Sequence, residues 1–198
     1  MYINENSKVF DRDDVDPRAK LAFSKIMRQM KIKQCIEYDD SLKIFGKATS
    51  LELNLIQMFE LRQFIGTSLN DMADCHYRFM SNRILFHSIN YQRMTKRNNG
   101  IVMLDNGRII AITELVIVTI SESEERKAIV LGYEYLPIPN RNSYEYRGFS
   151  SASFCTIVKA TRNVVACSPE RLTKKCIAID LGPGEIAVFN LPNPYERD

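Results

Sequence analysis

Asn106-Gly107, which separates two apolar runs, is the strongest local constraint on how this chain can fold. Asn-Gly between such runs is the strongest short hairpin signal, because both central residues of a type I′ turn need positive φ. We therefore expect residues 101–104 to pair with the long run 108–120. Short β-branched runs broken by turn residues continue from there, so residues 83–198 are predicted to form a small antiparallel barrel or sandwich.

The periodicity of the apolar residues is different in the earlier part of the chain. There the apolar residues recur every three or four positions, which is the spacing of a helix face. Asp16 followed by Pro17 is an N-cap with a first-turn proline, and it predicts a helix over 17–33. The predicted fold class is therefore α+β, with a short helical N-terminal cap at 1–82 and a small antiparallel β-barrel or sandwich at 83–198.

Two further helices are expected within this cap. Thr49 and Glu52 have the spacing of a capping box, which predicts a helix that continues to Ile65 and stops at Gly66. Ser68 can cap a third helix that continues to about residue 80. Methionines of the three helices could form an adaptable protein interface or could pack in the core. They are Met27, Met30, Met58, Met72 and Met80.

Composition and charge set limits on the class of protein. The 198 residues are enough to bury a real core, and 45% hydrophobic with 26% charged residues is ordinary for a globular domain. No apolar run approaches the ~20 residues that span a bilayer, and the start lacks the features of a signal peptide, so we expect an intracellular protein without membrane contact. The net charge of +3 is mild, so any nucleic-acid role must rest on a local patch.

The cysteines and histidines argue against a metal site. Five scattered cysteines, mostly within apolar runs, are best explained as reduced core thiols. A zinc site would need paired ligands at short spacing, and the chain has only two histidines, His76 and His87. No metal or cofactor is therefore expected. The cysteines are Cys35, Cys75, Cys155, Cys167 and Cys176.

A basic segment is the first candidate binding site. Arg93, Lys96 and Arg97, with Arg83 nearby, could contact phosphate groups, and Tyr91 could stack on an exposed base. The alternative is a hairpin edge that positive charge keeps soluble. Both interpretations remain open from the sequence.

A group of aromatic residues is the second candidate site. Rings that converge beside an acid, here Glu134 or Glu145, can hold a methylated lysine by cation–π attraction. A spacing of two residues puts both rings of each pair on one strand face, but such tyrosines also serve in core or cross-strand packing. The candidate peptide-binding residues are Tyr133, Tyr135, Tyr144, Tyr146 and Phe149.

No reactive constellation is visible in the sequence. It contains no nucleophile elbow, no phosphate-binding loop and no glycine-rich dinucleotide motif. The two glycines of DLGPGE lie between strand-like runs, where a tight turn explains them better than phosphate binding. We therefore expect a protein that is not an enzyme.

Three segments resemble a known domain when they are read together. They are NYQRMTKRNNGIVMLDNGRIIAITELV, GYEYLPIP and VVACSPERLTKKCIAIDLGPGEIAVFNLPNPYERD. Residues 83–198 resemble the uncharacterised β-rich C-terminal domain of animal transposon-derived proteins, which looks like a bromo-adjacent-homology (BAH) barrel. The matching residues include Tyr91, Arg93, Lys96, Arg97, Asn98, Asn99, Val102, Leu104 and Gly107.

The resemblance implies a non-catalytic module associated with chromatin machinery, and hence a nuclear location. The expected partner is a protein or a chromatin peptide, and assembly into a homo-oligomer fits such a module. The alternative function is direct nucleic-acid binding through the basic segment at 93–97.

Overall fold

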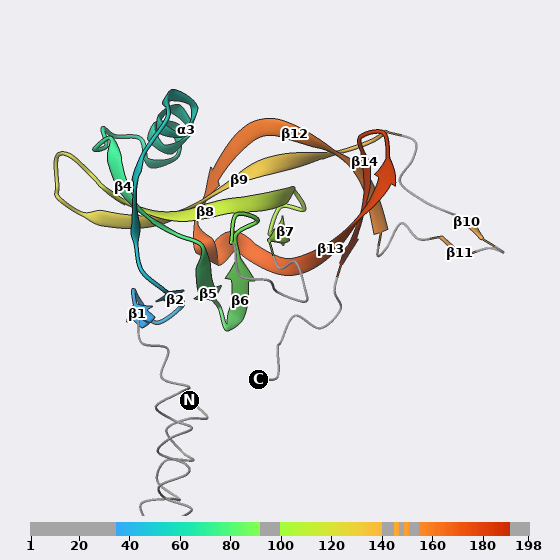
Figure 1. The fold of residues 1–198 in the computed structure, drawn as a ribbon, viewed down its shortest axis with the longest axis horizontal. Helices are drawn as coiled ribbons and strands as arrows, with labels where there is room; N and C mark the ends of the chain where they lie inside the picture. The colour runs from blue at the N-terminus through green and yellow to red at the C-terminus, as the bar shows by residue number, and fades with distance from the viewer. Residues whose placement is uncertain (1–34, 92–99, 140–144, 147–148, 151–154, 191–198) are drawn as a thin grey trace, which may run out of the picture. The chain divides into compact units, whose positions relative to one another are not determined.

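A computed structural model of the chain describes residues 35–91, 100–139, 145–146, 149–150 and 155–190 (Figure 1). These residues form mainly β-structure with one α-helix. They belong to a compact unit that begins at Cys35, so residues 35–82 and the predicted β-domain lie in the same unit. The predicted helix over 17–33 lies outside the described residues. No helix in the described part is both long and apolar enough to cross a membrane.

Six antiparallel strands close into a barrel because the last strand of the sheet returns to pair with an earlier one. The sheet order runs from β7 through β13, β14, β12 and β9, and β9 then pairs with β8, which already pairs with β7. The predicted antiparallel barrel is thereby confirmed. The barrel strands are β7 (Ile101–Leu104), β8 (Ile109–Thr119), β9 (Arg126–Pro137), β12 (Cys155–Cys167), β13 (Leu172–Gly182) and β14 (Glu185–Asn190).

Smaller elements flank the barrel. The sheet extends beyond β8 through β4 and β3, and a separate four-stranded sheet has the order β1-β2-β5-β6. Two-residue strands β10 (Glu145–Tyr146) and β11 (Phe149–Ser150) pair with each other. The remaining strands are β1 (Cys35–Glu37), β2 (Leu42–Phe45), β3 (Thr49–Glu52), β4 (Met72–His76), β5 (Arg78–Ser81) and β6 (Ile84–His87).

The predicted β7–β8 hairpin is present, but its turn differs from the expected type. Gly107 has a φ of 82°, whereas Asn106 is not among the residues with positive φ. The amide of Gly107 donates to the carbonyl of Leu104, and the amide of Leu104 donates to the carbonyl of Arg108. The loop therefore has three residues with a left-handed glycine at its end, which is the next most common hairpin connection.

The helix α3 (Leu55–Ile65) confirms one predicted boundary and corrects the other. Gly66 ends the helix with a φ of 82°, as predicted. The predicted start at Thr49 is wrong, because residues 49–52 pair with β4 as strand β3. The capping box is instead made by Asn54 and Gln57, each of which bonds the backbone amide of the other.

The third predicted helix, after Ser68, is wrong. Its residues form β4 and β5, in which Cys75 lies opposite Val116 of β8 and Phe79 lies opposite Phe86 of β6. Non-local pairing therefore overrides the local helical spacing. A continuous helical methionine face is absent from the described residues, since Met58 is on the buried face of α3 while Met72 is on a strand and 52% exposed.

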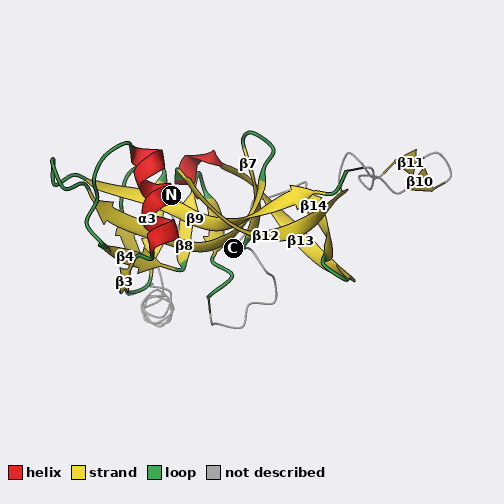
Figure 2. Ribbon diagram, turned by 90° about the horizontal axis from the view of Figure 1, so that it is seen from above, coloured by secondary structure: helices red, strands yellow, loops and turns green. Residues whose placement is uncertain are grey.

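Three large apolar clusters fill the unit. The barrel interior contains buried residues from β7, β8, β12, β13 and β14, with Tyr135 of β9 packed against them. A second cluster lies between the barrel and the small sheet, where Phe79 and Phe86 are fully buried. The third lies under α3, which lies across the sheet (Figure 2). Met58 and Leu61 of this helix belong to one cluster with buried residues of β8 and β9.

Close approach of β8 and β9 depends on a glycine. A Cβ at Gly132 would lie 2.7 Å from the carbonyl oxygen of Ala111, which is closer than real contacts of this kind. Just beyond the pair of Ile112 and Gly132 in the same two strands, the register shifts at Thr113, which is typical of a β-bulge. The bulge separates the part of β8 that pairs with β7 from the part that pairs with β4 and lies under α3.

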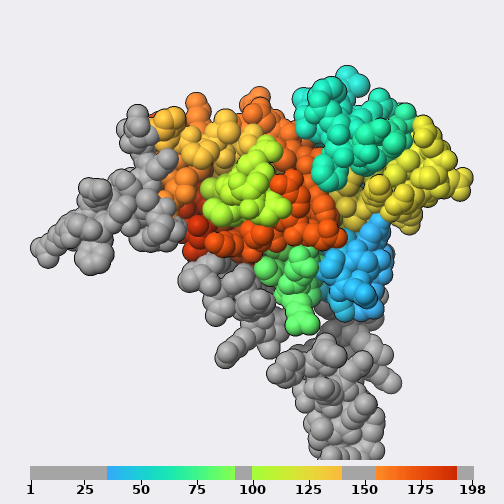
Figure 3. Space-filling view, turned by 180° about the vertical axis from the view of Figure 1, so that it is seen from behind, coloured from blue at the N-terminus to red at the C-terminus, as the bar shows by residue number. Residues whose placement is uncertain are grey.

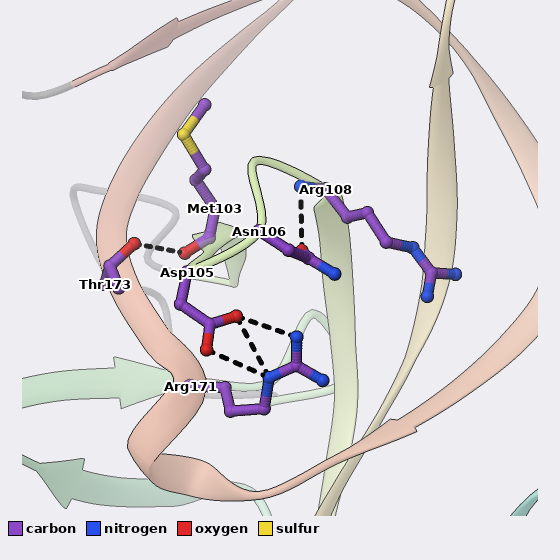
Figure 4. A network of polar contacts seen from close by, with 6 residues as sticks. All are labelled: Met103, Asp105, Asn106, Arg108, Arg171 and Thr173. Atoms are coloured by element: carbon purple, nitrogen blue, oxygen red, sulfur yellow. Dashed lines mark hydrogen bonds and ion pairs between the residues drawn. The ribbon is translucent and has the colours of Figure 1, made fainter.

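A polar network joins the β7–β8 turn to the start of β13 (Figure 4). Arg171 donates to both carboxylate oxygens of Asp105, with its terminal nitrogen 2.8 Å from Oδ1. The amide of Asp105 donates in return to the carbonyl of Arg171, and the Thr173 hydroxyl donates to the carbonyl of Met103. The segment between Cys167 and β13 is a single 3₁₀ turn, and this network holds it against the barrel.

Candidate interaction surface

A groove follows the exposed edge of β9 at one end of the unit. Its volume is about 320 Å³, and we call it the β9-edge groove. Four segments that are far apart in sequence line it: the β1–β2 turn at Tyr38, the end of α3 at Phe64, residues 125–129, and the 3₁₀ turn at Pro169. Figure 3 shows the blue, teal, yellow and orange segments meeting at this end.

The groove exists because β12 ends opposite Val130 and does not reach the start of β9. β12 pairs with β9 only from Val130 onward, whereas β9 begins at Arg126. The amide of Ile120 donates to the carbonyl of Glu125, so the backbone groups of Glu125 point toward β8. Backbone groups alternate in direction along an antiparallel strand, so those of Arg126 and Ala128 point away from β8. Those groups therefore point into the groove.

Tyr38 fills part of this open edge. Its hydroxyl donates to the carbonyl of Arg126, and the ring packs against the cluster beneath the small sheet. Burial raises the pKa of Tyr38, while the charge of Arg126 and a hydrogen bond from the backbone of Ala128 lower it. The tyrosine thus satisfies edge groups that no described strand pairs, which protects an otherwise open strand edge.

The charged groups around the groove are mainly acidic. Asp39, Glu125 and Glu170 line it together with Arg126 and Lys127, and Arg126 already forms an ion pair with Asp74. Hydrogen bonds from Ser41 and Leu42 outweigh burial and lower the pKa of Asp39, so this carboxylate is charged at neutral pH. Of the two basic side chains, only Lys127 has no ion pair among the described residues. The groove therefore has three carboxylates and one unpaired basic group.

The helix beside the groove exposes large apolar side chains. Phe64 lines the groove and is 42% exposed. Leu55, Ile56 and Phe59 lie on the outer side of α3 and are 59–90% exposed. A surface helix normally carries polar residues on its outer face, and clustered exposed apolar residues are a common feature of protein-binding surfaces.

A buried polar cluster fixes α3 on the sheet. Gln57 donates to the carboxylate of Glu114 over 2.7 Å, and Glu114 lies at the β8 bulge with 6% of its surface exposed. Burial raises the pKa of Glu114, whereas hydrogen bonds from Thr113 and Gln57 lower it. The hydroxyl of Ser88 donates to the carbonyl of Thr113 on the other side of the bulge. The position of the helix thus depends in part on the hydrogen bond between Gln57 and this buried carboxyl group.

The predicted basic site is described only in part. Arg83 is exposed at the β5–β6 turn, where both Asn82 and Arg83 have positive φ. Tyr91 follows the other end of β6 and stacks on His87 with ring centroids 5.0 Å apart. Arg83 and Tyr91 therefore flank opposite ends of β6, a four-residue strand about 10 Å long. Arg93, Lys96 and Arg97 lie outside the described residues, so the nucleic-acid interface stays a prediction.

The predicted aromatic site is also described in part. Tyr133 is 39% exposed, and Tyr135 packs against the barrel interior, where burial raises its pKa. Glu134 points to the opposite strand face and pairs with Arg108 at 2.8 Å. Tyr144 and the side chains of Tyr146 and Phe149 lie outside the described residues. The methyl-lysine site formed by these aromatic residues therefore also stays a prediction. Glu134 already forms an ion pair with Arg108.

The thiols differ in their exposure. Cys35 is exposed, and the other four cysteines are buried. Burial raises the pKa of Cys75 and Cys176 to about 11 and that of Cys167 to about 12. Within the described ranges, no three His, Cys, Asp or Glu side chains are grouped so that they could hold a metal ion.

Comparisons with known proteins leave the family undecided. No protein-family model matches the chain, and no curated protein or solved structure matches it. The resemblance to the BAH-like domain of transposon-derived proteins therefore stays a prediction.

Sequence reasoning did not find the β9-edge groove. Its residues are separated by up to about 130 positions in the chain, and none of its four segments has a recognisable motif. One signal was present in α3, because LNLIQMFELRQFIG is apolar on more of the helix surface than packing on one sheet requires.

Proposed function

We propose that this chain is a non-catalytic protein-interaction module that binds an extended, basic peptide in the β9-edge groove. The observation that carries the proposal is the excess of carboxylates around the part of the β9 edge that β12 leaves unpaired and Tyr38 partly fills. Glu125 and Glu170 line the groove from two different segments and are exposed, so they can pair with Lys or Arg side chains of a peptide that lies in it. Opposite charges across such a surface favour association and orient the partner.

The shape and lining of the groove support a peptide rather than a small molecule. The groove is open along a strand, and its aromatic residues Tyr38 and Phe64 offer apolar surface for the aliphatic stems of lysines and arginines. An extended chain can lie beside a strand edge and place alternate side chains in contact with it. The exposed apolar residues on α3 add surface for the protein that carries the peptide.

Chromatin is the setting that we propose for this interaction. Histone tails are extended and rich in lysine and arginine, which is the chemistry that the groove favours. The resemblance of residues 83–198 to a BAH-like domain of transposon-derived proteins supports the same setting, and with it a nuclear location.

The proposal is tested by titrating the full chain against fluorescein-labelled histone-tail peptides, unmodified and methylated, and following fluorescence anisotropy. An acidic peptide of the same length is the comparison ligand. We expect the basic peptides to bind and their affinity to weaken with added salt, because exposed ion pairs are screened. The double variant Glu125→Lys/Glu170→Lys should lose at least tenfold in affinity, which corresponds to about 1.4 kcal/mol.

A matched control distinguishes the effect of the groove residues on binding from the effect of a changed net charge. Glu52→Lys/Asp71→Lys changes the net charge by the same amount at exposed positions on and beside β3 and β4, which do not line the groove. This control should bind the basic peptides as the unmodified chain does. Absence of binding at millimolar peptide, or an equal loss in both double variants, would refute the groove as the binding site.

A further inference from the structure

The loop between β8 and β9 exposes two serines among acidic residues. Residues 121–125 have the sequence Ser-Glu-Ser-Glu-Glu, and all five are exposed. The yellow hairpin that carries them reaches beyond β4 at one end of the described unit (Figure 1). An exposed hairpin tip is a segment that another enzyme can reach, since loops of this kind are where modification and cleavage concentrate.

This loop leads directly into the β9-edge groove. Glu125, Arg126 and Lys127 follow it and line the groove. Ser123 precedes Glu125 by two residues, and its hydroxyl accepts a hydrogen bond from the amide of Glu125 over 3.3 Å. Consecutive Cα atoms are about 3.8 Å apart, so a charge on Ser123 lies within roughly one Debye length, about 8–10 Å, of the groove.

The two serines of the loop differ in their hydrogen bonds. The hydroxyl of Ser121 donates to the side-chain oxygen of Asn70 over 3.2 Å, and the amide of Ser121 donates to the carbonyl of Ser68. Ser121 is thereby held against the segment that precedes β4. The hydroxyl of Ser123 accepts one hydrogen bond and donates none to another described residue. Ser123 is therefore the serine whose hydroxyl can turn toward an enzyme.

We propose that Ser123 is a phosphorylation site for a protein kinase that selects acidic substrates, and that the phosphate strengthens peptide binding in the β9-edge groove. Glu124 and Glu125 directly follow this serine, and kinases choose substrates in part by such charge patterns. The effect on binding rests on the proposed function of the groove. The modification itself does not, because it can be measured without any peptide.

The transfer uses MgATP as its second substrate. Oγ of Ser123 attacks the γ-phosphorus of ATP, and an oxygen–phosphorus bond forms there. The bond from the γ-phosphorus to the bridging oxygen breaks, ADP leaves, and the hydroxyl proton passes to a base of the kinase. The product carries a charge of about −2 at neutral pH, which is comparable to two further carboxylates beside the groove. Repulsion from the neighbouring glutamates is screened, since all of them are exposed.

Mass spectrometry tests the modification. The full chain is incubated with MgATP and a serine/threonine protein kinase that prefers glutamate after the serine, and fragment masses then locate the phosphate. We expect the phosphate on Ser123. Ser123→Ala should lose this phosphate, whereas Ser121→Ala, the matched control in the same loop, should be modified as the unmodified chain is. A chain that remains unmodified at Ser123, or that takes the phosphate on Ser121 in its place, overturns the inference.

Fluorescence anisotropy with a labelled, unmodified histone-tail peptide tests the effect on the groove. The phosphorylated chain should bind this basic peptide roughly threefold more tightly, because the added negative charge attracts it. Treatment with a phosphatase should restore the original affinity, and Ser123→Ala incubated with the kinase should show no change.

The two proposals fail in different ways. If the unmodified chain binds the peptide and phosphorylation of Ser123 leaves the affinity unchanged or weakens it, the inference about the phosphate is overturned and the proposed function stands. If neither form binds the peptide, the proposed function fails, and the regulatory effect of the phosphate fails with it.

Discussion

The hydroxyl of Tyr38 donates a hydrogen bond to the backbone carbonyl of Arg126, which lies 88 residues further along the chain. This contact joins the β1–β2 turn to the edge of β9 that β12 leaves unpaired. The relationship explains how an open strand edge can persist beside a binding groove. Removing the Tyr38 hydroxyl group therefore tests this contact directly.

Replacing Tyr38 by Phe should lower the free energy of unfolding by about 0.5–1.5 kcal/mol, the usual net value of one hydrogen bond. The ring and its packing against the cluster beneath the small sheet remain, so the change isolates the hydroxyl. Urea denaturation followed by circular dichroism measures the difference. A variant as stable as the unmodified chain would show that the hydrogen bond contributes nothing.

Replacing Glu114 by Gln should leave the chain at least as stable at pH 7. Burial raises the pKa of Glu114 above its ordinary value of 4.5, so the unfolded state ionises first as the pH rises. The stability from the neutral carboxyl is therefore complete below about pH 4.5 and is lost as the pH rises through the folded-state pKa.

Denaturation of both proteins at pH 4 and pH 7 tests this. The amide of Gln imitates the neutral carboxyl, so the variant should gain stability relative to the unmodified chain between pH 4 and pH 7. A relative loss over the same interval would mean that the ionised form of Glu114 stabilises the fold.

Replacing Asn54 by Ala should cost about 1 kcal/mol of stability, because it removes the N-cap of α3. Gln63→Ala is the control in the same helix, at an exposed position. It should be neutral or slightly stabilising, because alanine has the higher helix propensity. Equal effects of the two changes on the urea midpoint would argue against a role for the cap.

One thiol should react rapidly in the folded protein. Cys35 is exposed, whereas burial raises the pKa of Cys75, Cys167 and Cys176 far above 8, and Cys155 is buried as well. Titration with an aromatic disulfide reagent at pH 8 should release one equivalent quickly and five after denaturation. Cys35→Ser should abolish the fast phase, and more than one fast equivalent in the unmodified chain would contradict this assignment.

The sequence predicted elements whose signals are local. The β7–β8 hairpin follows from Asn106-Gly107 between apolar runs, and the end of α3 follows from Gly66, where a left-handed backbone conformation is needed. The start of α3 was placed too early because the Thr49 segment has capping chemistry but is used as a strand. The capping pair that starts the helix is Asn54 and Gln57, with the same spacing five residues further along the chain.

Non-local features could not be predicted in the same way. The strand β4 forms because Cys75 pairs with Val116, some 40 residues later, and nothing in the local sequence opposes a helix there. The β9-edge groove depends on the register between β9 and β12 and on the approach of Tyr38. Such features result from register, which a single sequence does not reveal.

The most direct test of the central claim is to map where a basic peptide binds. Backbone amide chemical shifts of the labelled full chain would be recorded while an unmodified histone-tail peptide is added to saturation. We expect the largest changes at residues 125–129 and 168–170, with smaller ones near Tyr38 and Phe64. Changes concentrated at residues 92–99 or 177–181, or no changes at saturating peptide, would contradict the proposed function.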